Sequence, residues 1–575
     1  MNNDTRNMVL AIALSALVLL GWGLLSERFF PTPKKPVATA PAQPGAPAST
    51  TAAAPQAPAA PTMSRAQAIG SVPRVRIQTP SLIGSLNLKG ARFDDLAMVR
   101  QTETVKKDSP AARLLSPAGA PGAYFASFGW TGQGVAVPDA NTVWTASAPT
   151  LTPGKPVVLS WTNPTGQRFE LTVAVDDGYL FTVTQKVANG GTGPVAVRPF
   201  ALLSRADKSA DPDGWTHHVG PMAVLDSKAN YGINYKDLDE DRAGQRFSGN
   251  NGWIGFTDKY WLTALAPAGD GAIAASFRRG AGTSYQADYA LENKILPPGQ
   301  VLTDTTRLFA GAKEKKWLDS YEAAGTVPLI SKSIDWGWFE WFMRPIFALL
   351  VWLFHTIGNF GFAIIALTFI VRGLMYPIFD RQFRGMAAMR AVQPKMKEIQ
   401  ERHKDDRTRM QQELMELYKR EKINPAAGCL PIFLQIPVFY ALYKVLTVSV
   451  EMRHQPFILW IKDLSAPDPL TPINLFGLLP FDPPGLLHLG VLPILLGITM
   501  WAQFKLNPAP MDDVQKQIFS IMPWVLMFTM ASFAAGLQLY WVVSNILGIL
   551  QQKYLYSKYD ADRIAAKAGV TTVKT

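Results

Sequence analysis

The sequence predicts a multi-domain protein in which a polytopic α-helical membrane part with six transmembrane helices carries a large all-β domain. Three observations predict this fold class. Near the N-terminus, 18 successive residues are uncharged, at Met8–Leu25. Within residues 72–330, apolar and polar side chains alternate on both sides of the turn at 176–178, as in half-buried strands, and Gly, Pro and Asn recur at short intervals. Beyond residue 357, four regions are almost free of charge and long enough to approach or exceed a bilayer span.

The composition limits the class of protein. The chain has 575 residues and a mean hydropathy of +0.06, which suits a soluble domain joined to a membrane domain. Its net charge of +12 suits either nucleic acid or anionic lipid. The placement of the charges favours lipid, and we expect no direct nucleic-acid client. The single cysteine, Cys429, excludes an intramolecular disulfide and a cysteine-based metal site.

Residues 1–30 are predicted to form an N-terminal transmembrane anchor. A cleaved signal peptide is the alternative, but Ser26–Phe30 offers no small-x-small cleavage pattern. Residues 31–71 read as a linker, because Pro31–Pro61 holds 9 Pro and 11 Ala and cannot build a core. In polyproline conformation such a linker reaches about 90 Å.

Residues 72–330 are predicted to form a large antiparallel β-sandwich. The clearest hairpin pairs Phe169–Val175 with Phe181–Thr184 across the turn residues Asp176–Gly178. Residues 331–356 follow as an interfacial amphipathic helix, crowded with tryptophan and with Glu340 four residues before Arg344. A full membrane span is the competing reading of this helix.

Residues 357–556 are predicted to hold five membrane spans, which with the anchor makes six. The uncharged stretch Gln517–Gln552 would measure about 54 Å as one helix, too long for one span. We therefore predict two short spans that turn near Ala534-Ala535-Gly536. The other three spans are expected within Asn359–Phe379, Ala426–Tyr443 and Pro483–Phe504.

The distribution of basic residues predicts the topology. Asp380–Lys422 holds 12 Lys and Arg, whereas Glu451–Asp482 holds 2, so the positive-inside rule places the first in the cytoplasm. Counting spans then makes both termini and the tail 557–575 cytoplasmic, and exports residues 31–330. This topology requires an even number of spans before the basic segment, so residues 331–356 must not cross the membrane. Three basic residues just after the first span, Arg28, Lys34 and Lys35, oppose this assignment.

The basic segment 380–423 is predicted to be a cytoplasmic helical hairpin. Methionine, leucine and other apolar residues recur at spacings of three and four on both sides of a polar break at His403–Thr408. Pro394 should kink or restart the first helix. The methionine stripe either packs one helix on the other or forms an adaptable contact surface.

Arg372 is the conspicuous residue of the membrane part. An arginine inside a span costs several kcal/mol unless it is paired or hydrated, and it cannot escape by deprotonation. The five predicted spans after the β domain contain no Asp or Glu. Arg372 must therefore use water, neutral polar groups, lipid phosphate or an anion that a substrate brings.

Two interpretations of Arg372 remain open. The side chain can snorkel to the cytoplasmic headgroups, since Pro377 is only five residues away. Alternatively, it lines a wet cavity that faces the cytoplasm. Polar residues on the same helix face as Arg372 and on other predicted spans favour the second interpretation. With Arg372 they make up the candidate site: Thr368, Gln435, Tyr540, Ser544 and Asn545.

The sequence lacks the motifs of several enzyme classes. It contains no GxxxxGK[ST] loop, no GxSxG and no HExxH, and its spans lack the acidic residues usual for ion coupling. We expect no ATP hydrolysis, no catalytic residues, no cofactor and no metal.

Four motifs resemble the YidC family of membrane protein insertases. They are Thr368–Pro377 (TFIVRGLMYP), Met389–Lys395 (MRAVQPK), Asn424–Pro431 (NPAAGCLP) and Tyr540–Asn545 (YWVVSN). The specific resemblance runs from about 335 to 556, and the anchor, linker and β domain extend it to most of the chain. One departure is Ala534-Ala535-Gly536, where the family often has Pro-Ser-Gly.

The resemblance implies a five-helix insertase core around a hydrophilic groove, in the bacterial inner membrane. The groove arginine corresponds to Arg372, and the substrate contacts correspond to Thr368, Tyr540 and Trp541. Residues 31–330 would be periplasmic, with the β domain a supersandwich. The implied partners are nascent membrane proteins, the Sec translocon with its accessory subunits, the translating ribosome through cytoplasmic loops, and the bilayer.

We therefore expect an insertase and chaperone for inner-membrane proteins, working alone or with the translocon. A small-anion transporter that uses Arg372 is the first alternative, and internal repeats would favour it. An exported sugar-active enzyme tethered to the membrane is the second alternative, although one span would be enough for a tether.

Overall fold

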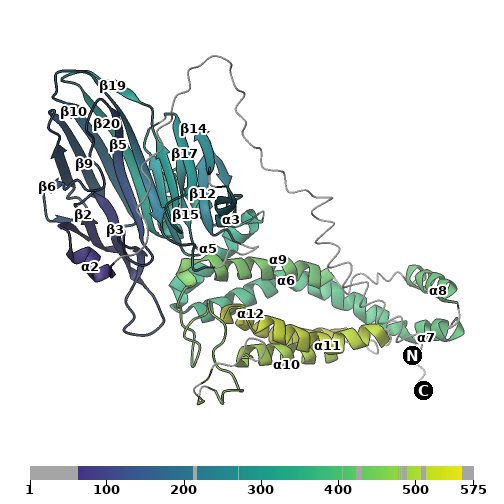
Figure 1. Ribbon diagram of the computed structural model, residues 1–575. Coiled ribbons are helices and arrows are strands. Elements are labelled where there is room, and N and C mark those ends of the chain that lie inside the picture. Colours follow the sequence, from purple (N-terminus) through teal and green to yellow (C-terminus); the bar gives the residue numbers. More distant parts are fainter. Residues whose placement is uncertain are drawn as a thin grey trace, which may run out of the picture. The chain divides into compact units, whose positions relative to one another are not determined.

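The protein is described from a computed structural model, in which residues 63–211, 217–241, 243–269, 271–337, 339–403, 406–421, 430–476, 478–479, 481, 488–506 and 513–559 are placed. The predicted anchor at 1–30 and the tail beyond residue 559 lie outside the described residues, as does the linker up to residue 62. In the described part, a β domain is followed by a helical domain, which confirms the predicted fold class (Figure 1).

The β domain contains two large sheets. The first has eleven strands and the central order β14-β17-β18-β11-β5-β3-β2-β1-β7. Almost all of its neighbours are antiparallel, the exception being β1 beside β7. Its strands are β1 (Arg74–Gln78), β2 (Leu82–Asn87), β3 (Arg92–Thr102), β4 (Ala111–Leu115), β5 (Tyr124–Gln133), β7 (Thr150–Leu151), β11 (Val195–Arg205), β14 (Gln245–Gly249), β17 (Ile273–Arg279), β18 (Tyr285–Ala290) and β19 (Lys294–Leu296).

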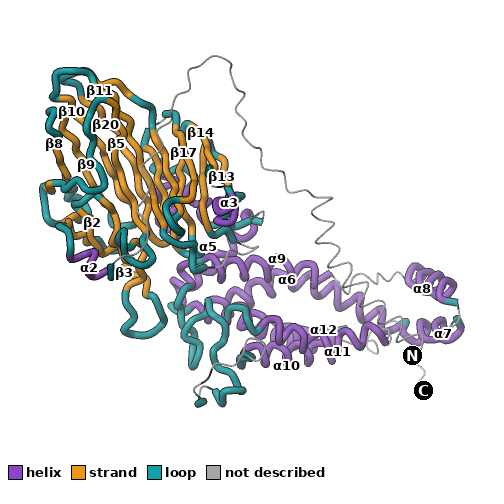
Figure 2. The backbone as a smooth tube through the Cα atoms, viewed as in Figure 1, coloured by secondary structure: helices purple, strands orange, loops and turns teal. Residues whose placement is uncertain are grey.

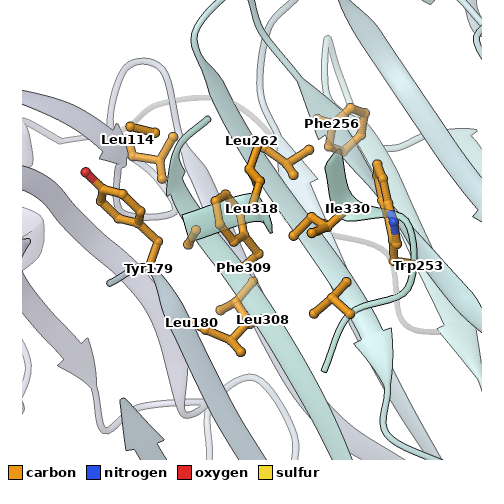
Figure 3. Close-up of a cluster of buried hydrophobic side chains, with 14 of the residues drawn as sticks. Leu114, Tyr179, Leu180, Trp253, Phe256, Leu262, Leu308, Phe309, Leu318 and Ile330 are labelled. Carbon is orange, nitrogen blue, oxygen red and sulfur yellow. The ribbon is translucent and has the colours of Figure 1, made fainter. Parts of the chain in front are cut away.

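The second sheet has nine strands in the order β13-β12-β15-β16-β20-β10-β9-β8-β6. Inward-facing side chains of both sheets form one apolar core, part of which surrounds Phe309 and Leu262 (Figure 3). Its strands are β6 (Thr145–Ala146), β8 (Val157–Thr162), β9 (Gln167–Val175), β10 (Leu180–Asn189), β12 (Gly220–Leu225), β13 (Lys228–Asn230), β15 (Gly252–Thr257), β16 (Trp261–Pro267) and β20 (Val301–Ala312).

The predicted hairpin is confirmed as β9 and β10, in which Val175 lies opposite Phe181. The Asp176 carboxylate closes its turn by accepting the amides of Gly178 and Leu180, at 2.9 and 3.0 Å. Helix α4 (Lys315–Ala323) packs onto this turn. A Cβ at Gly178 would lie 2.2 Å from the Tyr321 hydroxyl, so only glycine lets the helix approach so closely.

The end of the predicted linker is not extended in the structure. Residues 65–70 form helix α2 (Arg65–Gly70), capped by Ser64 and Gln67 in a capping box. Ala68 is buried, and Arg65 forms an ion pair with Asp95 of β3. Because these contacts order the chain, the β domain begins several residues before the predicted boundary at 72. One further short helix, α3 (Tyr235–Glu240), lies within the domain.

Helix α5 (Glu340–Ile357) occupies the segment predicted to be an interfacial helix, after a short 3-10 turn, η1 (Ile330–Ser333). Met343, Phe347, Leu350 and Leu353 form its buried face, whereas Trp341 and Trp352 are exposed on the other side. The predicted pairing of Glu340 and Arg344 is present at 2.8 Å. The helix is therefore amphipathic, as the sequence predicts.

The helices after α5 are α6 (Phe360–Ala391), α7 (Gln393–Arg402), α8 (Arg407–Arg420), α9 (Leu430–Val448), η3 (Val450–Met452), α10 (Val491–Lys505), α11 (Asp513–Met530) and α12 (Ala535–Lys558). Among the described residues, one helix segment, Phe360–Gly385, is long and apolar enough to cross a membrane by length and composition. Shorter apolar helices occupy Gln435–Val448, Val491–Lys505 and Gln517–Met530.

The predicted helical hairpin differs from its prediction in one respect. Helix α6 continues without a break from the apolar segment to Ala391, so the first hairpin helix is an extension of α6 rather than separate. Pro394 then restarts the chain as α7, as predicted, because proline is tolerated in the first turn of a helix. Val392, Met396 and Leu417 pack α7 against α8.

The turn between the last two helices lies close to its predicted place. Helix α11 ends at Met530 and α12 begins at Ala535. The buried Gln538 amide donates to the carbonyls of Met530 and Phe533, at 2.8 and 2.9 Å. These bonds satisfy carbonyls that a helix end leaves open, and they help to end α11 where Pro-Ser-Gly is missing.

Candidate functional site

Arg372 of α6 is held by the neutral groups of one residue on α12. Its Nε donates to the Ser544 hydroxyl at 3.1 Å, and its Nη2 donates to the same hydroxyl and to the Ser544 carbonyl, both at 2.8 Å. No carboxylate within 4 Å pairs with Arg372 among the described residues. The guanidinium therefore keeps a positive charge that no acidic side chain neutralises.

Two further contacts shape the surroundings of this charge. The guanidinium carbon lies 5.1 Å from the centre of the Phe379 ring, two turns further along α6. A Cβ built on Gly548 of α12 would lie 3.4 Å from Arg372 Nη2 and 2.9 Å from Gln503 Nε2. Gly548 thus provides the room in which the side chains from α6 and α10 approach α12.

Gln435 and Tyr540 form a second polar contact in the helical domain. The Gln435 amide on α9 donates to the Tyr540 hydroxyl on α12 at 2.5 Å. Tyr540 is 1% exposed, while Gln435 is half-buried. Trp541, the residue after Tyr540, meets Phe439 of α9 edge to face, with 4.9 Å between ring centres.

Asn545 and Thr368 bond to residues other than Arg372. Asn545 Nδ2 donates to Thr499 Oγ1 of α10 at 3.1 Å, so it ties α12 to α10. Thr368 is fully buried, and its hydroxyl donates to the Ile364 carbonyl of its own helix at 2.7 Å. Its side chain therefore reaches a substrate only if neighbouring helices separate.

The structure joins most of the predicted polar residues into one connected group, because Tyr540 also lies beside Ser544 and Arg372, whereas Asn545 bonds elsewhere. Arg372 meets Ser544, Gln435 meets Tyr540, and Asn545 meets Thr499, and all three contacts use α12. Tyr540 and Ser544 lie four residues apart and share a face of α12, whereas Asn545 follows Ser544 directly and bonds toward α10.

Sequence reasoning missed Thr499, Gln503 and Lys444. Thr499 and Gln503 lie four residues apart on α10, a spacing that signals a polar stripe within an otherwise apolar span. Lys444 is 1% exposed near the C-terminal end of α9. Its ammonium donates to the Asp335 backbone carbonyl at 2.6 Å and lies 3.7 Å from the Asp335 carboxylate.

An ion pair and hydrogen bonds join α6 and α12 at the ends that the predicted topology places on the cytoplasmic side. The Asp380 carboxylate accepts from Lys558 Nζ at 3.0 Å and from the Tyr559 hydroxyl at 2.8 Å. Arg384 Nη2 donates to the same hydroxyl at 3.2 Å. The two helices that carry Arg372 and Ser544 are therefore also held together at one end.

Two family models match most of the chain. Residues 74–349 match the model described as the YidC periplasmic domain, and residues 352–562 match the model described as 60Kd inner membrane protein. The chain belongs to the YidC family of membrane protein insertases. It is accordingly an inner-membrane protein, and the β domain described above is the family's periplasmic domain.

Full-length relatives support this family membership. The membrane protein insertase YidC of Zymomonas mobilis subsp. mobilis is 45% identical over 97% of this chain and 96% of its own length. That of Nitrobacter hamburgensis is 46% identical over 96% and 95%. A crystal structure of an active YidC insertase shares 16% identity over 84% of this chain and 92% of its own, with a TM-score of 0.36.

The described residues contain no group of three or more His, Cys, Asp and Glu side chains that could hold a metal ion.

Proposed function

We propose that this protein inserts nascent membrane proteins into the bacterial inner membrane, and that Arg372 receives them in a hydrophilic groove. The bonding of Arg372 to neutral Ser544 supports this function most directly. An arginine bonded to a carboxylate would have its charge neutralised. Here the charge stays available for an acidic residue of a client.

The proposed mechanism needs no bound energy source. A client segment with an acidic flank approaches from the cytoplasm, and Arg372 attracts the flank in surroundings of low dielectric constant. Neutral partners on α9, α10 and α12 accept and donate hydrogen bonds while the flank passes. The apolar segment then moves into lipid, where about 20 apolar residues span the hydrocarbon core.

The proposed topology has six spans, with both termini in the cytoplasm and residues 31–330 in the periplasm. The basic hairpin then faces the cytoplasm, where it suits contact with a translating ribosome. Its apolar residues Val392, Met396 and Leu417 are buried between α7 and α8, which supports a packing role for the methionine stripe. Cooperation with the Sec translocon is part of the proposal.

Site-specific crosslinking to a stalled nascent membrane protein tests this function. The photoreactive residue replaces Gln435 of α9 or Trp541 of α12, both of which are half-buried. Leu550 of α12, which is 58% exposed, serves as the control. Crosslinks at Gln435 and Trp541 that exceed those at Leu550 are expected. Equal yields at all three positions would contradict a polar entry site.

Complementation tests the role of the charge. In cells depleted of the native protein, Arg372→Ala should impair insertion of a client with an acidic flank more than insertion of one with a neutral flank, and Arg372→Lys should retain part of the activity. Equal insertion of both clients by Arg372→Ala would remove the electrostatic role. Uptake of small anions by protein in liposomes would instead favour a transporter.

A further inference from the structure

The loop between α9 and α10 carries a compact group of exposed apolar side chains. Leu478 is 82% exposed, and Phe476 and Leu475 are more than half exposed. The sequence has no charged residue between Asp468 and Asp482. We call the exposed members the outer apolar loop: Ile473, Leu475, Phe476, Leu478, Leu479 and Phe481.

Five backbone amides of this loop donate hydrogen bonds to carbonyls within it. The amides of Phe476 and Leu479 donate to the carbonyls of Thr471 and Asn474, at 2.8 and 3.0 Å. The amides of Leu475, Leu478 and Phe481 also donate to carbonyls within the loop. An irregular segment can approach an apolar medium only if its polar backbone groups are paired, and these amides meet that condition.

One leucine and one phenylalanine of this loop adopt a backbone conformation that is energetically costly for residues with a Cβ. Leu475 and Phe476 have φ of 51° and 59°, in the left-handed region that side chains with a Cβ rarely enter. Buried polar contacts hold the turn in place: Thr471 Oγ1 donates to Asn474 Oδ1 at 2.8 Å. The fold thus maintains a turn whose large apolar side chains point outward.

The loop is fixed to the first turn of α10. The Asp468 carboxylate accepts the Leu492 amide at 2.8 Å and the indole N–H of Trp460 at 2.9 Å. The Val491 amide donates to the Leu470 carbonyl at 3.1 Å. The outer apolar loop therefore lies beside the start of α10, in the teal loop region next to that helix in Figure 2.

Helix α10 is too short to cross a bilayer alone. Its 15 residues extend about 22 Å, whereas the hydrocarbon core is about 30 Å thick. About 8 Å of apolar depth is left uncovered, and the apolar loop lies at the end where α10 begins. A short span is matched to a bilayer either by thinning the bilayer or by additional apolar surface.

We propose that the outer apolar loop inserts its side chains into the lipid acyl chains of the periplasmic leaflet, beside the start of α10. The proposal rests on the multi-span arrangement given under the proposed function. Its occupant is lipid, because the loop is uncharged, five of its backbone amides are paired, and it adjoins a helix that falls short of the bilayer thickness. The insertion would anchor α10 and locally displace outer-leaflet lipid where a client has to pass.

Depth measurement by spin labelling tests the proposal. The sole cysteine is first replaced, Cys429→Ser, and single cysteines are introduced as Leu478→Cys, Leu495→Cys and Lys462→Cys in full-length protein in liposomes. Leu495 is exposed on α10 and serves as the lipid control, and Lys462 is an exposed residue of the same outer segment and serves as the water control. Because Leu478 is so exposed, its substitution removes no buried contact.

The label at residue 478 should collide more with oxygen than with nickel-EDDA, as the label at 495 should, while the label at 462 should show the reverse. A label at 478 that behaves like the one at 462 places the loop in water and overturns the proposal. A label shielded from both reagents indicates that a second copy covers the loop, which also overturns it. If the label at 495 also reports water, the membrane arrangement itself fails.

Discussion

Arg372 on α6 donates three hydrogen bonds to Ser544 on α12, two to its hydroxyl and one to its carbonyl. These bonds join residues that are 172 positions apart in the chain, and no carboxylate in the described part of the chain pairs with the guanidinium. A double-mutant cycle measures whether Ser544 positions Arg372. Interhelical hydrogen bonds in membranes contribute on average about 0.6 kcal/mol, so Ser544→Ala should reduce insertion of a client with an acidic flank by about threefold.

Insertion by the double variant Arg372→Ala/Ser544→Ala should be no lower than by Arg372→Ala alone, because the hydroxyl then has no guanidinium to hold. Initial insertion rates into proteoliposomes supply the comparison. If the two losses simply multiply, Ser544 acts independently of Arg372.

We predict that position 548 tolerates only a small side chain, because Gln503 and Arg372 lie close to it. Gly548→Ala should insert nearly as well as the natural protein, because its Cβ meets Gln503 at the flexible end of a side chain. Gly548→Leu should displace Arg372 and Gln503 and lower insertion severalfold. Gly373→Leu is the matched control, since a Cβ at Gly373 on α6 meets nothing within 4 Å. Equal effects of the two leucine variants would show that Gly548 has no special role beside Arg372.

Gly178 should be required for the stability of the β domain. Gly178→Ala places a Cβ 2.2 Å from the Tyr321 hydroxyl and 2.8 Å from the Trp317 ring, which we expect to destabilise the domain by about 1–3 kcal/mol. Gly193→Ala is the control, because a Cβ there meets nothing within 4 Å. Thermal unfolding of the detergent-solubilised protein should separate the two variants, and coincident curves would refute the steric argument.

Lys313 should make the stability of the β domain depend on pH. This residue is 3% exposed, and its Nζ donates to the Asp258 carbonyl at 2.7 Å and to Thr257 Oγ1 at 3.1 Å. Burial lowers the pKa of Lys313 to about 8, against 10.5 in the unfolded chain. Between these values the unfolded chain binds more protons than the folded chain, so the contribution of Lys313 to stability rises with pH.

The difference in unfolding midpoint between the natural protein and Lys313→Met should therefore increase in favour of the natural protein from about pH 8 to pH 10.5. The variant serves as the reference that removes the titration of all other groups. A constant difference across this range would mean that the pKa of Lys313 is not lowered.

Local patterns in the sequence were sufficient to predict the fold class and several of its elements. Alternation on both sides of Asp176–Gly178 predicted the β9–β10 hairpin, and the lack of charge predicted the apolar helices. Such patterns depend on neighbours a few residues apart, so they can be read without knowing the tertiary structure. The conversion of the linker end into α2 could not be read, because it depends on a distant contact between Arg65 and Asp95.

The candidate site shows the same division. The order of residues is enough to place Arg372 in an apolar helix with no acidic residue in the predicted spans after the β domain, and to show polar residues on the last span. The packing of the helices was needed to show that Ser544 accepts from the guanidinium, that Asn545 bonds to Thr499 and that Thr368 bonds to its own helix. The reason is physical: periodicity fixes which face of a helix is polar, but hydrogen-bond partners follow from how helices distant in sequence pack together.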